Sequence, residues 1–164
     1  MKRLYVIRHA KASYPNDVSD YNRPLAKQGF LDIQNLSHYL KSKKFIPEYI
    51  LTSASNRTLE TCKIISKALH VNAEHIQKEP LIYGAPVDKL LNIISSIDIR
   101  YNALMVVGHN PTITLLINEI SDALIDYVPT SGVVIIDCEK SDWSNLVGTG
   151  KLLEFVYPQK LKSL

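Results

Sequence analysis

The stretch Leu4-Tyr5-Val6-Ile7-Arg8-His9 begins with four apolar residues and ends abruptly in two basic ones. A short apolar run that contains β-branched residues and stops at charge is typical of a buried strand. The same pattern returns at residues 49–52 and most clearly at residues 103–107, which are followed by Gly108. Strands that are apolar along nearly their whole length are typical of a parallel sheet covered on both sides.

Segments with helical spacing lie between these strands. Residues 27–44 carry Phe30, Ile33, Leu36 and Leu40 three or four positions apart, and residues 59–69 and 87–97 show the same period. Another helix is expected from Pro111, because proline suits a first turn, and further strands are expected at 133–137 and 152–157. The alternation predicts an α/β fold, with one domain over residues 1–164, a mostly parallel central sheet and helices on both faces.

The composition excludes several classes of protein. The 164 residues are 46% hydrophobic with a formal net charge of +3, and Lys and Arg are scattered along the chain. We therefore expect a folded core and neither a nucleic-acid nor a membrane surface. The N-terminal apolar run is too short for a signal peptide, so we expect a cytoplasmic protein, and a monomer. Cys62 and Cys138 form no CxxC pattern and are expected to be reduced thiols.

Polar residues follow three of the predicted strands. Arg8-His9 ends the first, Arg57 comes shortly after the second, and His109-Asn110 follows Gly108. In open parallel sheets ligands bind at the carboxyl ends of the strands, so these side chains are expected to share one crevice. Each also has a plain explanation when taken alone, namely a solvated strand end, a surface arginine or an ordinary turn.

Two histidines and two arginines at one crevice suit phosphoryl transfer. Neutral His9 can attack phosphorus, Arg8 and Arg57 can each give forked hydrogen bonds to phosphate oxygens, and His109 as an imidazolium can neutralise a third oxygen. Zinc is the alternative ligand for two histidines, but it needs a third ligand and the arginines would repel it. The residues therefore predict an anion site without a metal or cofactor.

These residues also resemble a known family. Arg8-His9-Ala10 is similar to the RHG signature of the histidine phosphatase (phosphoglycerate mutase-like) superfamily, the segment 53–57 with Thr61 to its second motif, and the segment 108–111 to its third. A narrower resemblance links the chain to the small SixA-type phosphohistidine phosphatases. It rests on residues 8–13, Arg23-Pro24-Leu25 with Gly29, residues 107–111 and Pro129-Thr130.

The resemblance implies roles for individual residues. His9 would be the phosphoryl acceptor, and Arg8, Arg57 and His109 would form the phosphate pocket. Ser13 and Arg23 would line the loop around the site, and Asn110 would help through its backbone N–H. Ala10 stands where the broad family has glycine, and we expect an ordinary φ there.

The choice of substrate depends on the general acid. Larger family members use a carboxylate to protonate a leaving alcohol, and the candidates here, Glu79 and Asp88, are better explained as surface charges. Imidazole leaves phosphohistidine without such help, because its nitrogen protonates near neutral pH. The predicted function is thus a phosphatase that works through phospho-His9 on phosphohistidine in a protein. The alternatives are a phosphatase for small phosphate esters such as sugar phosphates, and a non-catalytic domain that binds phosphoproteins.

Overall fold

The structure is a computed structural model that describes residues 1–164. Its strands are β1 (Lys2–Arg8), β2 (Tyr49–Ser53), β3 (Ile76–Glu79), β4 (Ala103–Gly108), β5 (Val133–Cys138) and β6 (Gly150–Val156). Its α-helices are α1 (Lys27–Ser42), α2 (Asn56–Leu69), α3 (Val87–Ser95), α4 (Thr112–Ile120) and α5 (Pro158–Lys162). Three short 3₁₀ helices are η1 (Asp20–Asn22), η2 (Ala73–His75) and η3 (Pro80–Ile82).

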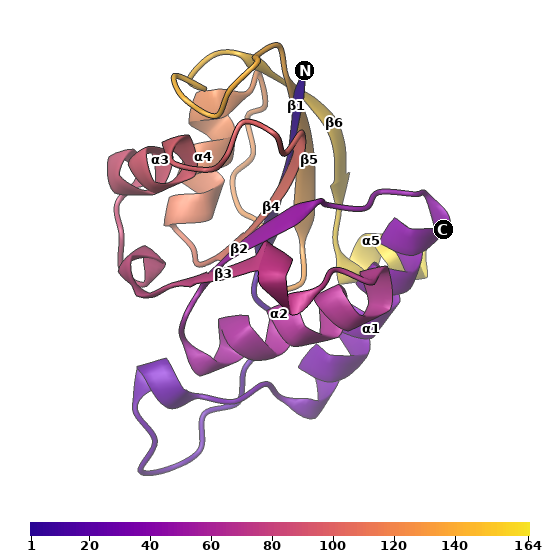
Figure 1. Cartoon of the computed structure of the whole chain (residues 1–164). Coiled ribbons are helices and arrows are strands. Elements are labelled where there is room, and N and C mark those ends of the chain that lie inside the picture. Colours follow the sequence, from indigo (N-terminus) through magenta and orange to yellow (C-terminus); the bar gives the residue numbers. More distant parts are fainter.

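All six strands belong to one sheet in the order β3-β2-β4-β1-β5-β6 (Figure 1). Strands β1 to β4 run parallel, while β5 and β6 are antiparallel to their neighbours. This confirms the predicted α/β fold with a mostly parallel sheet. The sequence pattern did not indicate β3, because its four residues IQKE carry only one apolar side chain and are no more than half-buried.

Helices cover both faces of the sheet, as predicted. Along β1, Leu4 and Val6 pack on the side of α3 and α4, whereas Tyr5 and Ile7 pack on the side of α1 and α2. Side chains that alternate across a strand in this way let one apolar run contribute to two cores. The C-terminal helix α5 lies beside α1 (Figure 1), and Leu161 packs against the core on the α1 and α2 side of the sheet.

One long connection bears on the site. Residues 13–24 leave the body between β1 and α1, carry η1, and lie beside the start of α2 (Figure 1). The base of this loop is fixed by a bridge between Ala12 and Leu25. Gly29 lies against it, since a Cβ atom there would come within 2.2 Å of the Lys11 carbonyl oxygen. The motif glycine at position 29 thus serves close packing of α1 on the loop base.

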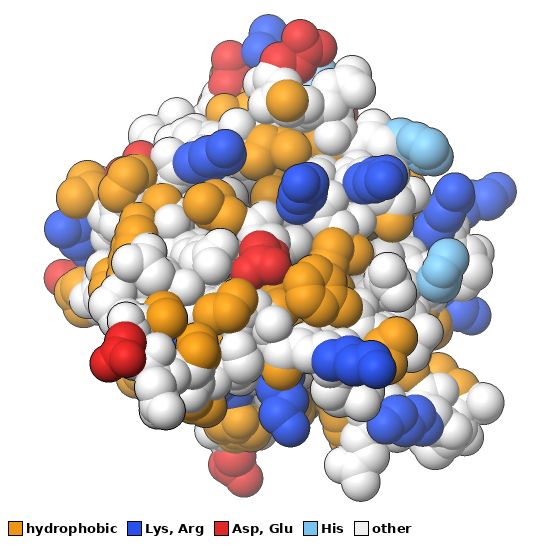
Figure 2. All heavy atoms as spheres, turned by 90° about the horizontal axis from the view of Figure 1, so that it is seen from below, with side chains coloured by type: hydrophobic (Ala, Val, Ile, Leu, Met, Phe, Trp, Pro, Cys, Tyr) orange, Lys and Arg blue, Asp and Glu red, His pale blue; other side chains and the backbone are white.

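The surface is mixed in charge. On the face seen from below, basic side chains are spaced among apolar and neutral ones (Figure 2). No helix is long and apolar enough to span a membrane. Both cysteines, Cys62 and Cys138, are buried free thiols, as predicted.

Candidate active site

The three polar strand ends meet at one edge of the sheet. Strands β2, β4 and β1 are neighbours in that order, so His9 after β1, Arg57 in the first turn of α2 and His109 after β4 come together. The rings of His9 and His109 lie with centroids 5.4 Å apart, and Arg57 Nε is 3.4 Å from His9 Nε2. The carboxyl ends of the parallel strands therefore form a crevice as the sequence predicts.

His9 is held in one tautomer. Its Nδ1 lies 2.8 Å from the carbonyl oxygen of Ala10, and only a protonated nitrogen can donate to a carbonyl. Nε2 then carries the lone pair of the ring, which accepts a long hydrogen bond of 3.4 Å from Arg57 Nε. Burial lowers the pKa of His9 to about 3, and the nearby charges of His109, Arg57 and Arg8 act in the same direction. At neutral pH the His9 ring is thus uncharged.

Arg57 connects His9 to the loop that carries η1. Its side chain is only 8% exposed, and Nη1 and Nη2 donate to the backbone carbonyl and the carboxylate of Asp20 at 2.7 and 3.1 Å. The remaining donor, Nε, lies 3.4 Å from His9 Nε2. The Arg57 guanidinium therefore lies between His9 and Asp20. A phosphoryl group bound at His9 could accept two parallel N–H···O hydrogen bonds from it.

His109 is uncharged in this structure. Its Nε2 bonds with Ser53 Oγ at 2.8 Å, while Nδ1 is buried without a partner. Burial and then the charge of Arg57 lower the pKa of His109 to about 4. The imidazolium expected from the sequence therefore requires a bound anion, which would compensate the charge of Arg57 and stabilise the protonated ring.

Binding of a tetrahedral oxyanion is accordingly expected to take up a proton at His109. Sulfate keeps a constant charge between pH 5 and 8, so any pH dependence of its affinity comes from the protein. If His109 is neutral in the free protein and takes up one proton when sulfate binds, the affinity for sulfate should fall by up to about tenfold for each unit that the pH rises. Isothermal titration calorimetry across this range, in buffers of different ionisation enthalpy, measures both the affinity and the proton. His109→Gln should remove the pH dependence. A flat profile in the unmodified protein would show that His109 stays neutral in the complex.

The Arg8 side chain is held by residues 127 and 128. Its Nη1 donates to Tyr127 Oη at 2.5 Å and to the Val128 carbonyl at 3.3 Å, while its Nε is buried without a partner. Ser131, which the sequence analysis did not single out, lies directly beside it. The Ser131 backbone N–H donates to the carbonyls of Arg8 and His9, its φ is 58°, and its buried Oγ has no partner.

The other predicted residues are more peripheral. Ser13 Oγ donates to the Pro24 carbonyl and closes the loop base, and Arg23 reaches the site only through Asp20, to which its Nη1 donates at 3.0 Å. Asn110 donates through its side chain to the Val128 carbonyl. Ala10 has no positive φ, as expected.

Gly108 is required by packing. Its φ is not positive, and a Cβ atom there would come within 2.8 Å of the Ile113 side chain. The glycine therefore lets α4 approach the end of β4.

Sequence reasoning misses Asp20, as it misses Ser131. Asp20 accepts hydrogen bonds from Arg57 and Arg23, and also from Tyr83 Oη at 2.5 Å. The Tyr83 ring in turn lies edge-on to His109, with centroids 5.4 Å apart. The sequence does indicate Tyr83-Gly84 as a pair that can flank the pocket. Nothing in the loop sequence distinguished Asp20 from its exposed neighbours, because its position depends on how residues 13–24 fold across α2.

A cavity of about 480 Å³ opens beyond these residues. Asp20, Arg57, Tyr83 and His109 line one side of it, and the start of α4 lines another. Glu79 and Asp88 do not line it. Glu79 instead accepts from the Leu81 backbone N–H, and Asp88 is exposed. The carboxylates considered as general acids are thus surface groups, as the sequence analysis favoured.

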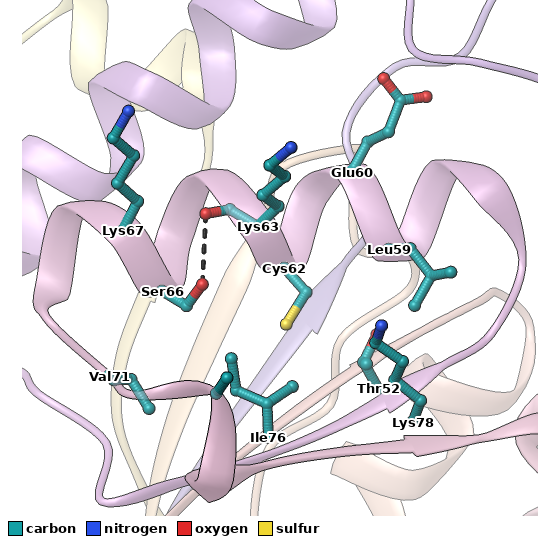
Figure 3. Close-up of a pocket in the computed structure, with 11 residues that line it drawn as sticks. Thr52, Leu59, Glu60, Cys62, Lys63, Ser66, Lys67, Val71, Ile76 and Lys78 are labelled. Carbon is teal, nitrogen blue, oxygen red and sulfur yellow. Dashed lines mark hydrogen bonds between the residues drawn. The ribbon is translucent and has the colours of Figure 1, made fainter.

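A second cavity, of about 550 Å³, lies between α2 and the strands β2 and β3 (Figure 3). Cys62 and Ile76 form part of its apolar lining, while Lys63 and Lys67 extend away from the strands. None of the predicted site residues lines it. No group of three or more His, Cys, Asp or Glu side chains is placed to hold a metal ion.

The site presents a neutral histidine beside an arginine and a second histidine, a set of groups that suits phosphoryl transfer. The family model of the histidine phosphatase superfamily (branch 1) matches residues 4–81 of the chain. Its structure is similar to a protein of Agrobacterium tumefaciens assigned as the phosphohistidine phosphatase SixA. The two are 26% identical with a TM-score of 0.80, and the match covers 96% of this chain and 98% of that one.

Two further proteins are similar to this chain. An uncharacterized protein of Mycobacterium tuberculosis is 24% identical over 140 residues, covering 79% of this chain and 85% of that protein. A mycobacterial glucosyl-3-phosphoglycerate phosphatase shares the fold at a TM-score of 0.65 and 11% identity, with 96% of this chain and 99% of that one covered. The family match and the SixA-like fold together support a phosphatase activity.

Proposed function

We propose that the protein hydrolyses phosphohistidine on a protein through a phospho-His9 intermediate. The observation that carries the proposal is the set of buried side-chain polar atoms left without a partner. Three exist in the chain, Arg8 Nε, His109 Nδ1 and Ser131 Oγ, and all belong to residues at or beside His9. Unpaired buried polar groups are costly and rare in native proteins, so their gathering here favours a ligand rich in acceptors.

A phosphoryl group meets this requirement. Its equatorial oxygens can accept from Arg8 and Arg57, whose forked donors match phosphate geometry, and from His109 once that ring is protonated. His9 Nε2 attacks phosphorus while Nδ1–H stays on the Ala10 carbonyl, and the leaving group departs on the opposite side. Water then attacks the phospho-His9. The electrons of the P–N bond return to Nε2, and the ring is regenerated neutral because Nδ1 has kept its proton.

The mouth of the site supports a protein substrate. Three exposed tyrosines each contact a charged residue of the site or of the loop 13–24. Tyr14 lies under the Arg23 guanidinium at 3.5 Å, Tyr83 bonds to Asp20, and Tyr127 bonds to Arg8. Exposed aromatic side chains of this kind are enriched at protein interfaces. When a phosphoryl group binds to the Arg8 guanidinium, the hydrogen bond from Arg8 to Tyr127 would break and leave the tyrosine free to contact the substrate.

The small-ester alternative lacks a comparable observation. It requires a proton donor at the leaving oxygen, and neither Glu79 nor Asp88 lines the cavity beside Arg57 and His109. The binding-domain alternative requires a histidine that is unable to attack phosphorus. His9 Nδ1 donates to the Ala10 carbonyl, which leaves Nε2 unprotonated and able to act as a nucleophile once Arg57 Nε turns to the phosphoryl group.

The proposal is tested by comparing substrates at neutral pH. A chemically phosphorylated histidine peptide, an aryl phosphate and a sugar phosphate are assayed for released phosphate. We expect kcat/KM for the phosphohistidine peptide to exceed that for the sugar phosphate by at least about a hundredfold, because imidazole leaves without general acid catalysis. A preference for the sugar phosphate would assign the site to esters. Tight binding without turnover of any substrate would identify a binding domain.

A further inference from the structure

The Asp20 carboxylate occupies the donors that a phosphoryl group would use. It accepts from Arg57 Nη2 at 3.1 Å through Oδ2 and from Arg23 Nη1 at 3.0 Å through Oδ1, and Tyr83 Oη donates to the same Oδ2. When a phosphoryl group takes the forked donors of Arg57, Asp20 must give up that contact. Arg23 and Tyr83 remain to hold the carboxylate close to the reacting group.

Asp20 also lines the cavity beside Arg57 and His109. Arg57 and His109 each contact His9 on one side and line this cavity on the other, while His9 does not line it. An in-line displacement at phosphorus sends the leaving group away from the attacking nitrogen, and therefore into this cavity. Asp20 is the only carboxylate in its lining, which otherwise includes the Tyr83 ring and apolar side chains such as Ile82, Leu90 and Ile113.

We propose that Asp20 selects the leaving group, by accepting a hydrogen bond from the distal ring N–H of the departing imidazole. This rests on the proposed function, since it assigns the substrate's leaving ring to the cavity. The leaving imidazole is a flat ring with one N–H group. The cavity offers it the Tyr83 ring for packing and the Asp20 carboxylate as a hydrogen-bond acceptor. A leaving group that carries its own negative charge is repelled by the same carboxylate.

The step balances without an acid. The distal nitrogen of the phosphorylated ring is protonated in solution near neutral pH, and a carboxylate beside it stabilises that protonated form. As His9 Nε2 forms its bond to phosphorus, the electrons of the old P–N bond return to the leaving nitrogen. The distal nitrogen keeps its proton, so neutral imidazole departs. The leaving ring and the attacking ring would then be held in the same way. Each would donate its N–H group to an oxygen of the protein, and for His9 that oxygen is the Ala10 carbonyl.

An alkyl ester gains nothing from this carboxylate. The hydrogen bond from Tyr83, together with those from Arg23 and Arg57, lowers the pKa of Asp20 against the opposing effect of burial. The group is therefore ionised at neutral pH and has no proton to give to a leaving alkoxide. Asp20 thus distinguishes phosphohistidine from phosphate esters by its charge.

The test compares Asp20→Asn with the unmodified protein on a phosphohistidine peptide and on an aryl phosphate, whose leaving phenolate needs little protonation. We expect kcat/KM to fall at least about tenfold more for the peptide than for the aryl phosphate. The alkaline limb of the peptide's pH profile should also move about one unit lower, because the ring loses the carboxylate that keeps it protonated. Asp20→Ala should behave in the same way.

Asp17→Asn is the matched control, since Asp17 lies on the same loop and takes part in no salt bridge. It should leave both substrates and both pH profiles unchanged. An equal loss on the two substrates in Asp20→Asn, with an unmoved pH profile, would overturn the leaving-group role and reduce Asp20 to a residue that orders the loop. If the unmodified protein hydrolysed the aryl phosphate and no phosphohistidine, the proposed function itself would fail, and this inference with it.

Discussion

Replacement of His9 by alanine is expected to reduce turnover by at least about 10⁴-fold, because the chain then lacks the nucleophile that splits hydrolysis into two steps. Rapid quenching with a phosphohistidine peptide, followed by mass spectrometry under alkaline conditions, should find the phosphoryl group on the peptide that contains His9 in the unmodified protein. The same experiment on His9→Ala should find no phosphorylated histidine. His9→Asn, which is closer in shape, should show the same loss.

The matched control is His38→Ala. The His38 side chain is exposed on α1 and makes no hydrogen bond to another residue. Its removal should therefore leave both turnover and the label at His9 intact. Sulfate binding and thermal unfolding would confirm that the His9 variants remain folded. A phosphoryl label on His109 instead of His9, or turnover that survives in His9→Ala, would contradict the assignment of the nucleophile.

Replacement of Arg57 by alanine is expected to lower kcat/KM by about 10²–10³-fold, the effect of removing one preorganised donor from a developing anionic transition state. The buried guanidinium donates to Asp20 and lies against His9, so its loss removes both positive charge and a forked donor. Arg57→Lys keeps the charge without the fork and should recover only part of the activity.

The same substitution should leave the fold almost unchanged, because the side-chain hydrogen bonds of Arg57 reach only Asp20 and His9 and none holds the sheet. Steady-state kinetics and thermal unfolding measure the two effects separately. Arg100→Ala is the control, since the Arg100 side chain is 70% exposed and pairs only with its neighbours Asp98 and Tyr101. A loss of activity in Arg57→Ala that follows a loss of stability would contradict a role at the phosphoryl group.

Most of the fold was predictable from apolar periodicity. Each central strand is a short apolar run, and each long helix repeats its apolar side chains every three or four residues, so burial alone specifies both. The exceptions have local causes. Strand β3 is short and polar and forms because Ile50 to Ser53 offer it a parallel partner edge. Helix α4 ends at Ile120, where the Ser121 hydroxyl donates back to the Ile117 carbonyl in the last turn.

The order of residues along the chain was enough to predict that His9, Arg57 and His109 would meet, because residues that follow adjacent parallel strands must emerge at one edge of the sheet. The surroundings of these three residues could be known only from the folded chain. The Ala10 carbonyl selects the His9 tautomer, burial keeps both histidines neutral, Ser131 stands beside β1, and Asp20 reaches Arg57 from a long loop. Periodicity reports which face of an element is buried. It carries no information on where a loop of twelve residues crosses a helix, since that path depends on contacts between residues far apart in the chain.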